Sequence, residues 1–218
     1  MDAVQEADLA AAPLTVSSLR DRVVDFTQPF MISRMVALMK KRHAAQLGIR
    51  SVRDLARQST MKYGTIDSGS TSSYFRYSRQ WDYERMWAEM AAGDDSFVRT
   101  TEEGIQRVLA STDEHPWAFI AMGATFSYAM PICNITLVPS DVWMPYSLAL
   151  PINSTFTDRL SLALMELRES DYLEELSIKW FQSENCDYAA NDAAKWFLCP
   201  PQQTARWLHT MLYFTKYW

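Results

Sequence analysis

One short segment carries residue types that bind small anions. Asp67, Ser68, Gly69, Ser70 and Thr71 form a polar turn between an apolar stretch and a helix-forming stretch. The first amides of a helix have no partner within the helix and lie at the positive end of its dipole. Gly69 lets the backbone approach a ligand closely, and Ser70 and Thr71 add hydroxyl donors. The segment therefore suits a carboxylate or a phosphate.

The same turn has two other interpretations. Helix N-capping by the side chain of Asp67 or Ser68 is the plainer role, and local sequence alone favours it. Asp67-Ser68-Gly69 also matches the signature of aspartic proteases, in which two aspartates share one proton. The chain has no second motif of this kind, and residues 74–90 are polar, aromatic and helical rather than strand-like. A protease is therefore disfavoured.

Arg20 is a second candidate for anion binding. A guanidinium group binds a planar carboxylate through two parallel hydrogen bonds, although most surface arginines are simply solvated. The chain contains no nucleophile elbow, P-loop or zinc-protease motif, and its three histidines have no catalytic partner at a recognised spacing. We therefore expect a binding protein that is not an enzyme and that needs no cofactor.

The cysteines offer neither a disulfide-rich framework nor a metal site. Cys133, Cys186 and Cys199 never approach a CxxC spacing, and no histidine stands near them at a ligand spacing. Their odd number is compatible with one pair and a spare thiol, or with no pair. Asn134 and Asn153 begin acceptor sequons for N-glycosylation, which are compatible with an extracellular location without establishing one.

The composition is that of an ordinary globular protein. The 218 residues are 48% hydrophobic and 22% charged, which is enough for a sizeable core. Lys and Arg total 21 against 26 Asp and Glu, so no basic excess favours nucleic acid as a partner.

The N-terminus lacks the pattern of a secretory signal. The longest uncharged run, residues 116–140, contains prolines and Asn134 and is interpreted as core rather than as a membrane span.

Helix and strand signals alternate along the chain, which predicts an α/β fold. Capping pairs mark the starts of several helices: Ser18 with Asp21, Ser51 with Asp54, and Thr100 with Glu103. The expected helices span residues 14–26, 52–58, 73–79, 83–90, 101–109, 155–167 and 172–181. The expected strands span residues 30–39, 61–66, 117–120 and 135–138. Residues 188–218 fit no template and receive no role.

Several motifs, in order, resemble the ligand-binding segments of ionotropic glutamate receptors. The end of the first segment is matched by Ala-Pro-Leu-Thr at 12–15, Arg20, Val-Val-Asp-Phe at 23–26 and Gln-Pro-Phe-Met at 28–31. The second segment is matched by Tyr-Gly-Thr-Ile-Asp-Ser-Gly-Ser-Thr at 63–71, Arg-Met-Trp at 85–87, Glu-Gly-Ile-Gln-Arg-Val-Leu at 103–109 and Lys-Trp-Phe at 179–181. The resemblance covers about residues 8–187 and is nearest to the kainate-type receptors.

This resemblance implies a two-lobed clamshell of the periplasmic-binding-protein type, with an incomplete upper lobe and a ligand in the interlobe cleft. Residues 1–39 would be the end of the first segment, and residues 51–187 the second. Residues 40–50 would be a short join where the family has three membrane segments, so the chain would contain no pore. Residues 188–218 remain an unassigned tail.

The resemblance also implies site residues. The ligand would contact the Pro13 backbone, the Thr15 hydroxyl, the Arg20 guanidinium, Ser70, Thr71 and Tyr146. Met122 stands where the family has an acid for the ligand's ammonium group, so glutamate binding is expected to be weak or absent. Cys133 and Cys186 match a family disulfide, which would leave Cys199 unpaired.

The implied function is the ligand-binding portion of a ligand-gated cation channel at the cell membrane, on the extracellular side. Its partners would be a small carboxylate or amino acid and further receptor subunits. A soluble periplasmic-type amino-acid-binding protein is the alternative, followed by the aspartic-type protease and by a chain without a stable pocket.

Overall fold

The computed structural model describes residues 7–93, 95–126 and 134–181, which divide into two compact units. Within these residues, the first unit takes the chain up to Ser33 and again from Trp143, and the second takes Arg34–Val142. Two strands, β3 (Met31–Lys40) and β7 (Ile135–Leu150), continue from one unit into the other. The chain mixes helices and strands in alternation, which confirms the predicted α/β class.

The sheet of the second unit is built around β6 (Trp117–Met122). Its strand order is β7-β3-β6-β4-β5, with β4 at Lys62–Ile66 and β5 at Phe97–Val98. β6 pairs antiparallel with β3, placing Met122 opposite Met35, and parallel with β4. All six residues of β6 are buried. A strand covered on both faces needs no polar side chain, which explains the uninterrupted apolar run.

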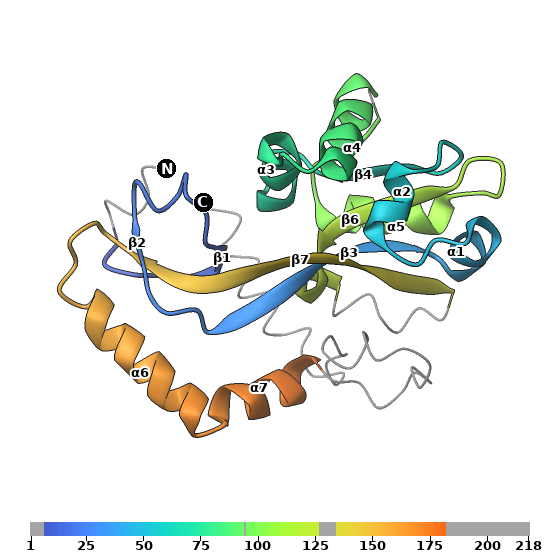
Figure 1. The fold of residues 1–218 in the computed structure, drawn as a ribbon. Coiled ribbons are helices and arrows are strands. Elements are labelled where there is room, and N and C mark those ends of the chain that lie inside the picture. Colours follow the sequence, from blue (N-terminus) through green and yellow to red (C-terminus); the bar gives the residue numbers. More distant parts are fainter. Residues whose placement is uncertain (1–6, 94, 127–133, 182–218) are drawn as a thin grey trace. The chain divides into compact units, whose positions relative to one another are not determined.

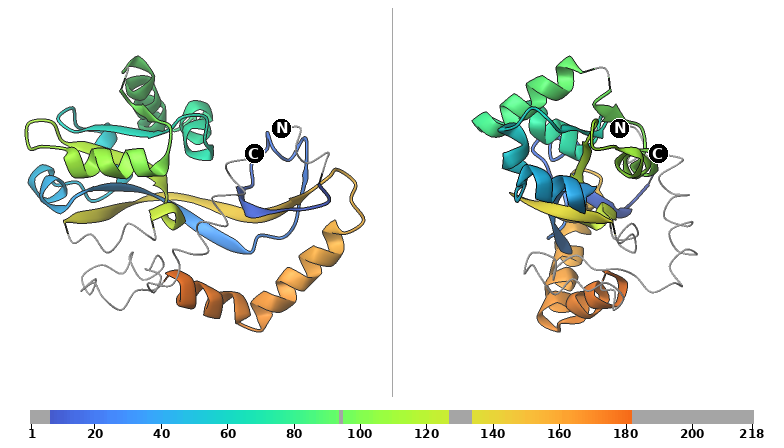
Figure 2. Two further views of the ribbon diagram at one scale, coloured as in Figure 1. Left: turned by 180° about the vertical axis from the view of Figure 1, so that it is seen from behind. Right: turned by 90° about the vertical axis from the view of Figure 1, so that its right-hand side faces the viewer.

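Helices pack against this sheet (Figure 1). α5 (Thr101–Ala110) places Ile105 and Val108 in one apolar cluster with Phe119 of β6. α3 (Ser70–Tyr77) also contacts β4 and β6, and it lies beside α4 (Trp81–Ala92), as both views of Figure 2 show. The remaining helices of this unit are α1 (Lys41–Leu47), α2 (Val52–Ala56) and the short 3-10 helix η2 (Gly123–Phe126).

The first unit combines short strands with two exposed helices. β1 (Ala10–Thr15) and β2 (Asp25–Phe26) pair antiparallel with the C-terminal part of β7, where Thr15 lies opposite Tyr146. α6 (Thr157–Glu169) and α7 (Tyr172–Phe181) contact each other and follow one another around a bend, in orange in Figure 2. No residue of α6 is buried.

The helix expected over residues 14–26 is wrong. β1 continues to Thr15, residues 18–23 form turns, and Asp25 and Phe26 form β2. The apolar residues Leu19, Val23 and Val24, which suggested one face of a helix, do not share one buried face, since Leu19 and Val23 are 47% and 45% exposed and only Val24 is buried. A short helix gains most of its stability by packing such a stripe, whereas the strands gain hydrogen bonds with β7.

Other element predictions agree with the structure to within a few residues, apart from three differences. The turn at residues 40–50 contains α1, which ends at Gly48 with a φ of 65°. α3 begins at Ser70 rather than at residue 73. β7 is 16 residues long, far beyond the expected strand 135–138, because Pro139, Asp141 and Pro145 interrupt its apolar pattern without ending the strand.

Replacement of Gly104 by Ala should destabilise the second unit. A Cβ at this position would lie 2.6 Å from ring atoms of Phe119, which is fully buried and packs edge-on against Phe126. Overpacking of a core costs about 1–3 kcal/mol, and the higher helix propensity of Ala offsets about 1 kcal/mol of that. Urea denaturation should therefore show a net loss of up to about 2 kcal/mol.

Gly69→Ala is the matched control for this substitution, because the nearest atom to its Cβ would lie at an ordinary 3.7 Å. Its unfolding free energy should change by less than about 0.5 kcal/mol. A Gly104→Ala protein as stable as the unaltered protein would contradict the packing described for α5 and β6.

Candidate functional site

Arg20 lies in the first unit among groups that leave its charge unbalanced. Its Nη1 donates to the carbonyl oxygen of Thr15 at 3.0 Å. Thr15 is buried at the end of β1, and Pro13 lies exposed on the same strand. Among the described residues, no Asp or Glu forms an ion pair with Arg20. The guanidinium therefore has donors directed at a backbone carbonyl but no anion beside it.

Tyr146 is the buried neighbour of this arginine. It lies in β7 opposite Thr15 and is only 5% exposed. Burial raises the pKa of Tyr146 to about 12, while a hydrogen bond with Ser33 and the charge of Arg20 act in the opposite direction. Burial likewise lowers the pKa of Arg20, and the nearby Tyr146 phenol opposes that change. The phenol is thus a neutral hydrogen-bonding group at physiological pH.

The N-terminus of α3 is free of the capping that local sequence favours. Gly69 occupies the N-cap position, and no side chain accepts a hydrogen bond from the first turn of the helix. The expectation that Asp67 or Ser68 caps this helix is therefore wrong: Ser68 Oγ instead donates to Asp67 at 3.3 Å. The cause is conformational, since Ser68 adopts a φ of 58° and the helix starts one residue later.

Ser70 and Thr71 consequently form the first turn of α3 together with Ser72. The Oγ of Ser72 donates to the carbonyl of Gly69 at 2.9 Å, and no acidic residue stands in this turn. Thr71 is buried and Ser70 is half-buried. Unpaired helical amides with adjacent hydroxyls attract an anion.

Met122 lies at the end of β6 in the second unit and is 3% exposed. It pairs with Met35 of β3, and Gly123 starts η2 directly after it. A thioether in this position has no charge to offer an ammonium group.

The other residues named in the sequence analysis are the two sequon asparagines, which the structure describes, and the three cysteines, which it does not. Asn134 and Asn153 are exposed, which leaves both sequons accessible. Cys133, Cys186 and Cys199 lie outside the described residues, so their pairing stays a prediction. Among the residues that the structure describes, no group of three or more His, Cys, Asp or Glu side chains is arranged to hold a metal ion.

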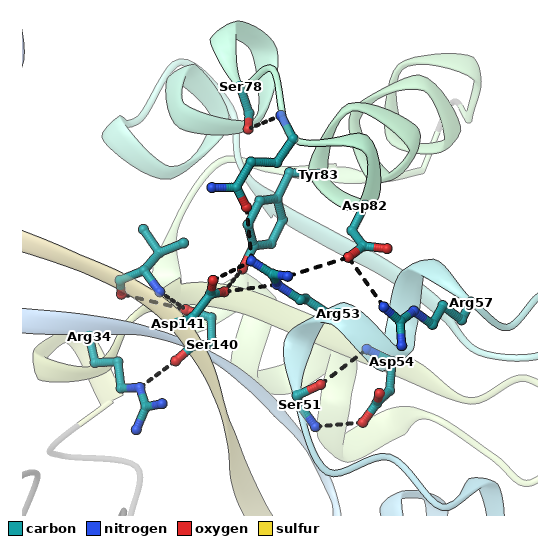
Figure 3. A network of polar contacts seen from close by, with 12 residues as sticks. Arg34, Ser51, Arg53, Asp54, Arg57, Ser78, Asp82, Tyr83, Ser140 and Asp141 are labelled. Carbon is teal, nitrogen blue, oxygen red and sulfur yellow. Dashed lines mark hydrogen bonds and ion pairs between the residues drawn. The ribbon is translucent and has the colours of Figure 1, made fainter.

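A polar network in the second unit was not predicted from the sequence (Figure 3). Asp141 of β7 accepts hydrogen bonds from Arg53 of α2 and from the hydroxyl of Tyr83 in α4. Burial raises the pKa of the Asp141 carboxyl, but the hydrogen bonds from Tyr83 and Arg53 outweigh this and lower it. Arg53 also donates to Gln80 at 3.0 Å. The partners are up to 88 positions apart, so no local motif could reveal them.

The N-terminal residues match a family of receptor domains. Residues 3–43 match the family described as "Ligated ion channel L-glutamate- and glycine-binding site". The human glutamate receptor ionotropic, kainate 5, is 38% identical over 138 residues, which are 62% of this chain and 14% of the receptor. A glutamate receptor of the snail Lymnaea stagnalis is 38% identical over 136 residues, 61% of this chain and 15% of that protein. The chain thus matches only a small part of each receptor.

A solved structure extends the similarity over most of the chain. The Drosophila muscle GluRIIB complex with glutamate shares 31% identity with this chain, at a TM-score of 0.74. The match covers 84% of this chain and 71% of the Drosophila chain. This likeness confirms the predicted fold class, a two-lobed fold of the periplasmic-binding-protein type. Within the part of the chain that is described, no helix has the length and apolar character needed to cross a membrane.

Alkaline pH should reveal the buried phenol of Tyr146. An unfolded tyrosine loses its proton near pH 10, whereas the native Tyr146 keeps it until about pH 12. The unfolded chain therefore binds fewer protons in this window, and the free energy of unfolding falls as the pH rises from 10 to 12. Its share is of the order of 2 kcal/mol. Urea titrations across this range should show a shallower fall for Tyr146→Phe.

Tyr77→Phe provides the control for this measurement, because the side chain of Tyr77 is 61% exposed. Its curve should run parallel to that of the unaltered protein. Identical slopes for the Tyr146→Phe and unaltered proteins would show that this phenol is not desolvated in the native state.

Proposed function

The chain belongs to the ionotropic glutamate receptor family, in the region that binds ligand, and from this premise we propose that it binds a small carboxylate, with Arg20 as the carboxylate-binding residue of the first unit and the first turn of α3 as an anion-binding turn of the second. The family consists of receptors and ligated channels rather than enzymes, which favours binding over catalysis. In this proposal the Thr15 hydroxyl and the Pro13 backbone also contact the ligand beside Arg20. The buried phenol of Tyr146 lies near Arg20 and helps to fix its position.

The single observation that carries the proposal is the unbalanced charge of Arg20. Burying a cation is unfavourable unless an anion or several hydrogen bonds compensate it. Arg20 has one backbone acceptor and a lowered pKa, and no acidic partner among the described residues. A ligand carboxylate would supply that missing partner through two parallel hydrogen bonds.

The first turn of α3 supplies further hydrogen-bond donors for a carboxylate. Its amides and the hydroxyls of Ser70 and Thr71 offer donors, and no side chain caps the amides, since the Ser72 hydroxyl donates to the carbonyl of Gly69. Donors of this kind hold carboxylates without a formal positive charge. We therefore propose that this turn binds a carboxylate oxygen in the second unit.

Met122 stands where an acidic residue would be needed to bind an ammonium group of the ligand. The Drosophila relative is a complex with glutamate, a ligand that carries an ammonium group besides its two carboxylates. The buried thioether of Met122 offers no charge to such a group. We propose that the ligand of this chain is a small carboxylate whose amino group, if it has one, contributes little to the affinity.

We also propose that the chain works in a receptor subunit at the cell membrane, as its relatives are membrane receptors. Residues 41–47 form α1 in the place where the family has membrane segments, so the assigned role is ligand binding without pore formation. Two accessible sequons at Asn134 and Asn153 are compatible with exposure of this region outside the cell.

Substitution of Arg20 by Gln should abolish most ligand affinity. A panel of amino and carboxylic acids is first scanned for compounds that raise the melting temperature of the unaltered chain. Loss of a charge-assisted contact costs about 1.5–3 kcal/mol, which corresponds to a roughly 10- to 150-fold increase in Kd by calorimetry.

Arg22→Gln is the matched control, because Arg22 is exposed and the substitution removes the same charge two positions away. It should bind the same compound with an unchanged Kd. Equal affinities of the Arg20→Gln and Arg22→Gln proteins, both of them folded, would refute the proposed role of Arg20.

Comparison of glutamate with glutarate tests the ligand class. The two compounds carry the same carboxylates, but glutarate lacks the ammonium group. Because Met122 provides no counter-charge, the two Kd values should agree within about fivefold, and glutamate should bind no tighter than glutarate. A glutamate Kd in the micromolar range and far below that of glutarate would show that another group binds the ammonium.

A further inference from the structure

A hollow in the second unit shares no lining residue with the proposed ligand site. It has a volume of about 480 Å³ and opens to solvent. Its polar lining comes from β3, from the start of α2 and from β7, and comprises Arg34, Arg50, Ser51, Arg53, Ser140 and Asp141. A liquid water molecule occupies about 30 Å³, so the hollow has room for a solvated polyatomic ion or a larger group.

Positive charge dominates this lining. Three arginines stand against the one carboxylate of Asp141, which gives a formal charge of +2 in a chain whose net charge is −5. The neighbouring acids are already occupied. The Asp54 carboxylate accepts hydrogen bonds from the amides of Arg50 and Ser51, and Asp82 pairs with Arg53 and Arg57. Neither acid lines the hollow, so the charge of the lining itself is positive.

The arginines are held in position by different contacts. Arg34 Nε donates to the carbonyl of Ser140, and Arg53 donates to Asp141, as Figure 3 shows. Arg53 also donates to Gln80. Arg50 is different: its backbone amide binds Asp54, and its exposed guanidinium has no recorded partner among the described residues. Guanidinium groups that line one hollow favour an anion with several oxygens, because a guanidinium can donate two parallel hydrogen bonds.

We propose that this hollow binds a phosphate group, either as the free ion or as the monoester of a small molecule, with Arg50 as its principal ligand and Arg34 and Arg53 as supporting charges. A tetrahedral oxyanion offers a separate oxygen acceptor to each guanidinium, whereas chloride is a single centre that cannot match the planar pair of donors of a guanidinium. The site would act separately from Arg20, so phosphate and the carboxylate ligand would occupy the chain together.

Calorimetry of the full chain with inorganic phosphate tests this proposal at constant ionic strength, with chloride as the competing anion. The expected result is saturable binding that Arg50→Gln weakens at least tenfold. Arg79→Gln removes the same charge from an exposed position outside the hollow and should leave the Kd unchanged. Equal effects of the two substitutions, or no saturable binding, would overturn the proposal.

Arg20→Gln distinguishes this site from the proposed carboxylate site, which could itself attract phosphate. Phosphate binding should persist in Arg20→Gln; its loss there together with its retention in Arg50→Gln would overturn the assignment to the hollow. Glycerol phosphate identifies the occupant. A Kd at least tenfold below that of inorganic phosphate indicates a monoester, and similar values indicate the free ion.

Discussion

The backbone hydrogen bonds of β7 position the polar residues of both proposed sites. Within the first unit, the amide of Val16 donates to Pro145, that of Phe30 to Tyr146 and that of Thr27 to Leu148, at 3.0–3.1 Å. These bonds hold β1 and the turn that carries Arg20 beside Tyr146. Within the second unit the same strand presents Ser140 and Asp141 to Arg34 and Arg53. One strand thus supports two positively charged sites.

Both proposed sites rest on an arginine that forms no ion pair with an acid among the described residues. Arg20 has a carbonyl but no described acid beside it, and Arg50 has an exposed guanidinium beside an aspartate already occupied by amides. Acidic residues outnumber basic ones in the chain as a whole, so these two places do not follow from the overall balance. Such local excess of charge is the usual mark of a surface shaped for an anion.

Local sequence patterns correctly predicted the features that depend on neighbouring residues, such as helix capping and a buried strand. The Ser51–Asp54 capping box forms with both of its hydrogen bonds, and the continuous apolar run at Trp117 predicts a buried strand correctly. The polar turn correctly predicted a helix after it, but α3 begins three residues earlier than expected and lacks the side-chain cap that local sequence favours. Residue types alone pointed to Arg20, Ser70 and Thr71 as anion-binding candidates, whereas the other residues of the candidate site came from the resemblance to a family. Arg20 and Ser70 fall on a turn and a helix start that can serve that role.

The rest depended on partners distant in sequence. Residues 14–26 carry helical spacing, yet pairing with a strand 120 or more positions away holds their ends extended. The length of β7 was underestimated because its prolines and Asp141 look like breaks, while neighbouring strands and Arg53 stabilise them. The network of Arg53, Tyr83 and Asp141 has no local signature for the same reason.

The exposed helix α6 has a consequence for the energetics of the chain. It spans 13 residues without a buried side chain, and Leu162 and Met165 remain accessible to water. Its anchors are polar: Ser161 accepts from the amide of Gln28, and Arg168 donates to the carbonyl of Pro29. A helix held in this way opens at a free energy well below that of global unfolding. Its amide protons should therefore exchange with solvent long before those of β6.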